Sequence, residues 1–120
     1  MTEIKTLEEL NNILTDNKKV LVKIGASWCA PCKMVEKTLE DLEESYPDVV
    51  FLKVDCDEAD EIVESLDIMS VPVLLYYTDG IVERRNTGSM SKEQIIKLLN
   101  KNPAASPIIN CLTTLTLYGF

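Results

Sequence analysis

The 120-residue chain contains no histidine, and this absence removes several kinds of active site. A Ser-His-Asp triad, a metal site built on imidazole and a zinc finger of the Cys/His type all need a side chain that the protein lacks. Basic residues are also scarce, 12 against 20 acidic ones, and the net charge is −8. Because nucleic-acid binding needs clustered Lys and Arg, we exclude a nucleic-acid partner.

Long apolar runs are missing as well. No stretch of about 18 uncharged apolar residues occurs, so we expect no membrane-spanning helix and no membrane partner. The first residues show a charged and polar pattern instead of the apolar run of about 7–15 residues that a secretory signal needs. We therefore expect a cytoplasmic protein. Thiols are kept reduced in that compartment, so its cysteines are more often catalytic or metal-binding than structural.

The residues that are present suffice for one domain, since a chain of this size buries roughly two-thirds of its unfolded surface. Capping-box patterns, apolar periodicity and Pro31 predict helices over 7–15, from about 31 to near 46, over 58–66 and over 91–100. Asp57 is expected to cap the third of these helices. Apolar runs predict strands over 20–24, 49–54, 73–77 and 81–85, the last two joined by a hairpin. This order predicts a mixed sheet with helices on both faces.

Residues 102–120 differ in kind, because they carry no charge. Their first part is typical of a stiff linker, and the rest has a strand-like composition rich in Leu, Thr and Ile. An added strand, a dimer contact and a stretch foreign to the domain all remain open. We expect an extension without a catalytic role and a monomeric protein, with a dimer through this tail or through Cys111 as the alternative.

The chemistry lies in the motif Trp28-Cys29-Ala30-Pro31-Cys32-Lys33, between a predicted strand and a predicted helix. The spacing brings two sulfurs close enough for a disulfide, and a helix N-terminus favours a thiolate. We expect Cys29, the more exposed sulfur, to attack a substrate disulfide, and Cys32 then to attack Cys29 and release the reduced product. Two alternatives are an inert pair and half of a four-cysteine zinc site, although Cys56 and Cys111 are not spaced as a second half.

These residues make the chain resemble the thioredoxin family. The segment WCAPCK is similar to the family's WCGPCK, Val71-Pro72 stands where the family carries an active-site cis-proline, and Gly88 resembles its glycine beside the substrate groove. The resemblance covers residues 1–101, which we take as the thioredoxin domain, with 102–120 as the uncharged apolar extension. It implies the thioredoxin fold, a three-layer α/β/α architecture with a central mixed five-stranded sheet and four helices.

The resemblance also implies a function. A thioredoxin-type protein-disulfide reductase holds no bound cofactor beyond its redox-active disulfide, here Cys29–Cys32. Its electrons come indirectly from NADPH through a thioredoxin reductase, and its other partners are disulfide-containing client proteins. The same resemblance places client binding at Trp28, Val71, Pro72 and Gly88.

Three departures from the family pattern concern the redox site. Lys23 replaces a buried Asp six residues before Cys29, Ala30 replaces a glycine, and Gly25 replaces a tryptophan. Three interpretations of Lys23 are open. Its amine stays charged and favours thiolates, or it loses its proton and serves as a base. In the third, the stem of the side chain bends and the amine reaches solvent. With Ala30 and Pro31, Lys23 is thus a site-tuning residue. We expect a slower or more oxidising enzyme than a typical thioredoxin, and Asp at position 23 should lower the potential.

Other functions remain possible on the same fold. A binding or chaperone module would use its thiols only to regulate contact, and an oxidase or isomerase would run the chemistry in a more oxidising direction. Cys56 lies between two carboxylates that should raise its pKa, so we expect a quiet thiol. The charged run over residues 33–44 is interpreted as a solvated helix face.

Overall fold

The computed structural model describes residues 1–100, so the predicted extension and the pairing through Cys111 lie outside the described residues. The elements follow in the order β1 (Thr2–Glu3), α1 (Leu7–Asp16), β2 (Lys19–Gly25), α2 (Ala30–Glu43), β3 (Val50–Asp55), α3 (Asp60–Ser65), β4 (Val73–Thr78), β5 (Ile81–Thr87) and α4 (Lys92–Asn100). The five strands form one mixed sheet in the order β1-β3-β2-β4-β5. Strands β1, β3 and β2 are parallel, and β4 and β5 are antiparallel to their neighbours.

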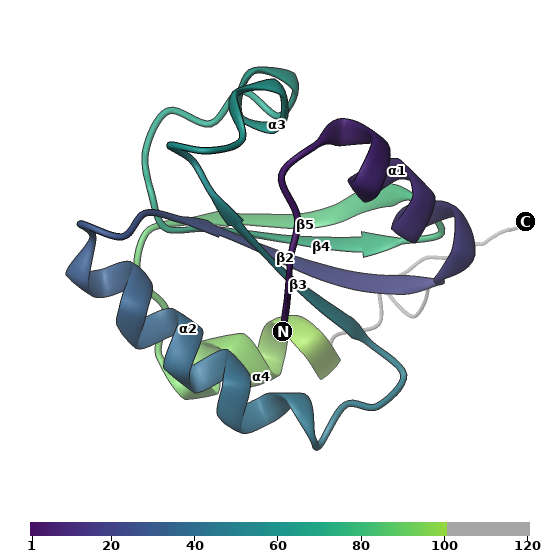
Figure 1. Cartoon of the computed structure of the whole chain (residues 1–120). Helices are drawn as coiled ribbons and strands as arrows, with labels where there is room; N and C mark the ends of the chain where they lie inside the picture. Colours follow the sequence, from purple (N-terminus) through teal and green to yellow (C-terminus); the bar gives the residue numbers. More distant parts are fainter. Residues whose placement is uncertain (101–120) are drawn as a thin grey trace, which may run out of the picture.

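Helices cover both faces of the sheet, as Figure 1 shows: α1 and α3 lie on one face, α2 and α4 on the other. Alternation along β2 separates the two halves of the core. Val20, Val22 and Ile24 pack in the cluster under α1 and α3, whereas Leu21 packs with residues of α2 and α4. Lys23 follows Leu21 at the strand's period of two. It therefore points to the layer that α2 covers, in the middle of the sheet.

The predicted architecture is confirmed, with local corrections. Helix α2 ends at Glu43 instead of near residue 46, because the chain leaves the helix through turns in which the amides of Ser45 and Tyr46 bond back to Leu42 and Glu43. The strand β1, with only two residues, was not predicted from local pattern. Within the described part of the chain, no helix has the length and apolar character needed to cross a membrane.

The start of α3 differs most from expectation. The helix begins at Asp60 with Ala59 as its cap residue, and no side chain caps it, so the prediction that Asp57 caps this helix is wrong. The Asp57 carboxylate instead accepts a hydrogen bond from the indole of Trp28, at 2.8 Å. The Asp57 carboxylate, which was expected to accept a hydrogen bond from the start of α3, therefore binds Trp28, a residue distant in the sequence.

Candidate active site

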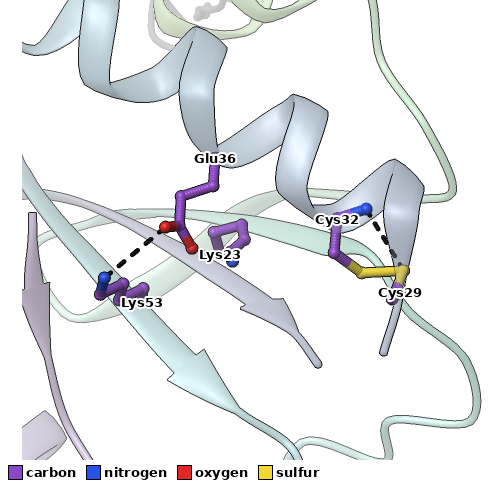
Figure 2. Close-up of polar contacts among 5 residues, drawn as sticks. All are labelled: Lys23, Cys29, Cys32, Glu36 and Lys53. Carbon is purple, nitrogen blue, oxygen red and sulfur yellow. Dashed lines mark hydrogen bonds and ion pairs between the residues drawn. A yellow bond between two sulfur atoms is a disulfide. The ribbon is translucent and has the colours of Figure 1, made fainter. Parts of the chain in front are cut away.

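The two motif cysteines form a disulfide where the chain passes from β2 into α2, with a Cα–Cα distance of 5.3 Å. Cys29 is the cap residue of α2, and its sulfur accepts a hydrogen bond from the backbone N–H of Cys32 at 3.2 Å (Figure 2). Cys29 is 6% exposed and Cys32 1%. The predicted order of exposure is therefore correct, although both residues are buried. A helix N-terminus directs unpaired N–H groups and a partial positive charge at the Cys29 sulfur.

The proline predicted to lie at the active site is buried, and the residue before it packs beside the disulfide. The Val71–Pro72 peptide bond is cis, as expected, and Val71 packs against the small cluster of Ala26, Cys29 and Cys32. Gly88 donates its backbone N–H to the carbonyl of Pro72 at 2.8 Å and has a φ of 103°, a conformation that favours glycine. The structure thus joins the segment before β4 to the segment after β5 beside the redox pair.

Trp28 is the large exposed side chain of the motif, at 69% of its surface. Its hydrogen bond to Asp57 ties the loop that precedes α2 to the turn that follows β3. Ala30 and Pro31, the other two residues between the cysteines, are exposed in the first turn of α2. The Trp28 side chain is thus an exposed apolar group held beside the disulfide by its hydrogen bond to Asp57.

Lys23 does not reach solvent. It is 5% exposed, and its amine donates a hydrogen bond to Glu36 Oε1 at 2.7 Å, so the interpretation in which its stem bends outward is wrong. The physical reason is its place on a central strand beneath α2, where a carboxylate lies within reach. Glu36 also pairs with Lys53, at 3.6 Å. Figure 2 shows the two lysines approaching Glu36 from β2 and β3, while Glu36 descends from α2.

Glu36 was not singled out from the sequence, because the charged run over 33–44 predicted a solvated face. It is four residues after Cys32, so both side chains lie on the same face of α2, which here is the face turned to the sheet. Hydrogen bonding to Lys23 is the main cause that lowers the pKa of the Glu36 carboxyl below its ordinary value. The carboxylate is therefore ionised at neutral pH. The exact register of Lys23 with Lys53 on adjacent strands supplies its second partner.

A pocket of about 230 Å³ lies behind the disulfide and is lined by Cys32, Lys23, Glu36, Lys53 and Gly25, among others. Gly25 leaves this space open. A Cβ at that position would lie 3.1 Å from the Lys23 Nζ and 3.2 Å from the Cys32 Sγ. The lysine amine and the buried sulfur are therefore neighbours with no side chain from β2 between them.

Cys56, the free cysteine of the described residues, packs against the redox pair, a proximity that sequence spacing did not reveal. Its backbone N–H bonds to the carbonyl of Gly25 at 2.8 Å, since the ends of β2 and β3 are adjacent. Burial raises the pKa of its thiol first, and Asp57 and Asp55 raise it further, as predicted. These three consecutive residues place ligand atoms within 4.8 Å of one another, but three donors fall short of a four-ligand zinc site.

A cysteine pair at the start of a helix, on an α/β/α sandwich with a cis-proline loop beside it, defines the class of dithiol–disulfide oxidoreductases. Comparison with known proteins narrows this class. The family model for thioredoxin matches residues 1–101. A thioredoxin of Mycoplasmoides gallisepticum is 35% identical over 99 residues, which cover 82% of this chain and 99% of the relative. Thioredoxin-1 of Saccharomyces cerevisiae is 30% identical over 105 residues, 88% of this chain and 90% of the relative.

Solved structures agree with the sequence matches. The Plasmodium falciparum thioredoxin structure superposes with a TM-score of 0.78 at 29% identity, covering 82% of this chain and 96% of that one. The oxidized form of mitochondrial thioredoxin 3 from Saccharomyces cerevisiae gives 0.75 at 31% identity, with 81% and 91% covered. The chain belongs to the thioredoxin family. It is a thiol–disulfide oxidoreductase of the protein-disulfide reductase type, with the Cys29–Cys32 disulfide at its active site.

Proposed function

We propose that the reduced protein attacks client disulfides with Cys29 and is resolved by Cys32. The Cys29 thiolate bonds to one client sulfur and the client's S–S bond breaks, giving a mixed disulfide and one client thiolate. The Cys32 thiolate then attacks Cys29, the intramolecular disulfide forms, and the second client thiolate leaves. Two electrons pass from the pair to the client.

The observation that carries this assignment is the placement of the two sulfurs relative to α2. Cys29 is the cap residue, at the positive end of the helix dipole, and it is the more exposed of the two. Cys32 lies one turn further on and is almost fully buried, so a client cannot approach it directly. A less buried attacker and a more deeply buried resolver suit this two-step chemistry.

Trp28, Val71, Pro72 and Gly88 make up the client site in this proposal, with Trp28 exposed, Val71 and Gly88 partly exposed and Pro72 buried. Trp28 offers an exposed apolar face next to Cys29, and Val71 packs against the pair. The backbone of Val71 would bond to an extended client segment, as in strand addition to a sheet. A thioredoxin reductase that draws on NADPH would return the pair to its dithiol form. We place the protein in the cytoplasm, where such a dithiol is kept reduced, although one relative, thioredoxin-3 of Saccharomyces cerevisiae, is mitochondrial.

Trapping tests the assignment of roles. The Cys32→Ser variant, mixed with a protein disulfide, should accumulate a mixed disulfide that peptide mapping places at Cys29. The Cys29→Ser variant should accumulate none, and Cys56→Ser should behave like the wild type. A stable adduct at Cys32 in Cys29→Ser, formed as fast as the adduct at Cys29, would reverse the roles.

A further inference from the structure

The proposed function leaves one step without a physical explanation, which is how the buried Cys32 thiol loses its proton. Cys32 is 1% exposed, and burial disfavours the charged form of a thiol. Resolution nevertheless requires a Cys32 thiolate, because the thiolate is the species that attacks a disulfide. A group that stabilises the negative charge is needed on the buried side of the pair.

The Lys23 ammonium is in position to provide that stabilisation. Its Nζ and the Cys32 Sγ lie 3.1 and 3.2 Å from the same point above Gly25, so their separation cannot exceed the sum of those two distances. No side chain of β2 separates them, because residue 25 is glycine. A neighbouring lysine is one of the features that lower a cysteine pKa in proteins.

Glu36 explains why a lysine is tolerated at this place. Burial by itself disfavours an ammonium, and the Glu36 carboxylate at 2.7 Å offsets that cost. Glu36 is in turn shared with Lys53 at 3.6 Å, and its side chain is 30% exposed. The charged groups that line the pocket balance, three carboxylates against three lysines, so the effect on Cys32 depends on how near and how buried each charge is.

Titratable groups from several elements surround Cys32. Those that line the pocket are Glu3 of β1, Lys23 of β2, Lys33 and Glu36 of α2, and Lys53 and Asp55 of β3. Cys56 packs against the pair from the turn after β3. Among these groups, Lys23 is the charged residue that is nearly fully buried, so its charge is the least screened by solvent.

We propose that the Lys23 ammonium, positioned by Glu36, stabilises the Cys32 thiolate and thereby sets the rate at which the mixed disulfide is resolved. This inference rests on the proposed function. The Cys32 proton passes to water in the pocket of about 230 Å³, a volume that holds several water molecules. The thiolate then attacks the Cys29 sulfur, the Cys29–client bond breaks, and the leaving client thiolate takes up a proton from solvent.

Glu36 acts through Lys23 and is not itself the proton acceptor in this account. Its hydrogen bond from Lys23 lowers its pKa, and a carboxylate with a lowered pKa is a weak base. Glu36 as a group that positions Lys23 and Glu36 as a proton acceptor lead to opposite predictions for a variant that already lacks the Lys23 charge. Without Lys23, loss of a proton acceptor would slow resolution further, whereas loss of a nearby negative charge would not.

The experiment follows one turnover of the pair. Reduced protein, carrying Cys56→Ser and Cys111→Ser so that only the pair reacts, is mixed with one equivalent of dithiobis-nitrobenzoate at a series of pH values. The first thionitrobenzoate reports attack by Cys29, and the second reports resolution by Cys32. The variants are Lys23→Met, Lys23→Arg, the double variant K23M/E36Q and the control Lys19→Met. Lys19 lies on the same strand and pairs with Asp48 at 3.0 Å, far from the disulfide.

Lys23→Met should release the second equivalent about tenfold more slowly at neutral pH, with the rate profile displaced by about one pH unit upward. Lys23→Arg keeps the charge, so its rate for the second equivalent should stay within about threefold of the wild-type rate. Lys19→Met should release the second equivalent at the wild-type rate. K23M/E36Q should be no slower than Lys23→Met. A methionine in place of a buried, paired lysine is usually tolerated, and Lys23→Gln repeats the test if it is not.

Three outcomes would overturn the inference. An unchanged rate and pH profile in Lys23→Met would show that the charge has no effect on Cys32. A double variant slower than Lys23→Met would make Glu36 the proton acceptor. A wild-type chain that releases only the first equivalent would overturn the proposed function together with the inference.

Discussion

The indole Nε1 of Trp28 donates a hydrogen bond to Asp57 Oδ2 at 2.8 Å, which fixes the exposed side chain beside the disulfide to the turn after β3. Asp57→Ala should leave the indole free to rotate and raise KM for a protein disulfide up to about fivefold, equivalent to a lost hydrogen bond of about 1 kcal/mol. Steady-state reduction of a protein disulfide measures this. Asp57→Asn keeps an acceptor oxygen and should stay near the wild type, while a wild-type KM in Asp57→Ala would remove this role from the contact.

Cys56 should be a slow thiol. Burial and the carboxylates of Asp57 and Asp55 raise its pKa, so little thiolate exists at neutral pH and alkylation should accelerate as the pH rises. In the reduced protein, mass spectrometry after timed alkylation should find Cys29 labelled well before Cys56. Cys56→Ser should retain wild-type turnover. Alkylation of Cys56 as fast as Cys29 at neutral pH would contradict the expected protection.

Glu36 should contribute to the acid sensitivity of the fold. Its pKa is lowered in the folded protein, chiefly by the hydrogen bond from Lys23. The folded state therefore gains stability from Glu36 above the ordinary glutamate pKa of about 4.3, and loses it as the pH falls through the lower folded value. Between about pH 5 and pH 3, Glu36→Gln should lose less free energy of unfolding than the wild type. Denaturant titrations at each pH measure this loss.

A matched control is available on the same helix. Glu40 is exposed, and Glu40→Gln should follow the wild-type dependence on pH. If Glu36→Gln also follows the wild-type curve, the ion pair does not contribute to stability in the acid range.

Lys23 should influence the reduction potential as well as the rate. A cation beside the sulfurs stabilises thiolates, hence the dithiol form, so its removal in Lys23→Met should make the potential more negative. The difference should widen as the pH rises and the thiolate fraction grows, up to about 30 mV for each unit of change in a thiol pKa. Lys23→Asp places a negative charge there and should shift the potential further in the same direction. Trp28 fluorescence in thiol buffers of defined potential measures both variants, and equal potentials at every pH would contradict the effect.

The fold was predictable because its signals are local. Capping boxes at Thr6 and Ser91, the apolar run of β2 and the Asp79-Gly80 turn each depend on residues a few positions apart, and both turn residues have a positive φ. The cysteine pair was likewise identified by its motif, whereas the cis-proline was expected only from the resemblance to the thioredoxin family. The strand β1 was not, since two residues carry no periodicity.

The charged part of the site was not predictable for the opposite reason. Glu36 belongs to a run of alternating charges that is typical of a solvated face, and only the burial of Lys23 beneath α2 shows that one of these carboxylates points inward. Asp57 has the spacing of a helix cap, but Trp28, distant in the sequence, binds its carboxylate. Contacts between distant residues decide both cases, and local patterns do not contain them.

Turnover tests the central claim most directly. Insulin is mixed with this protein, NADPH and a thioredoxin reductase, and the oxidation of NADPH counts the disulfides reduced. A protein-disulfide reductase working through Cys29 and Cys32 should reduce many equivalents of insulin disulfide per chain, and Cys32→Ser should stop after at most one. Reduction of no more than one equivalent by the wild-type chain, with a reductase shown to reduce its disulfide, would contradict the account.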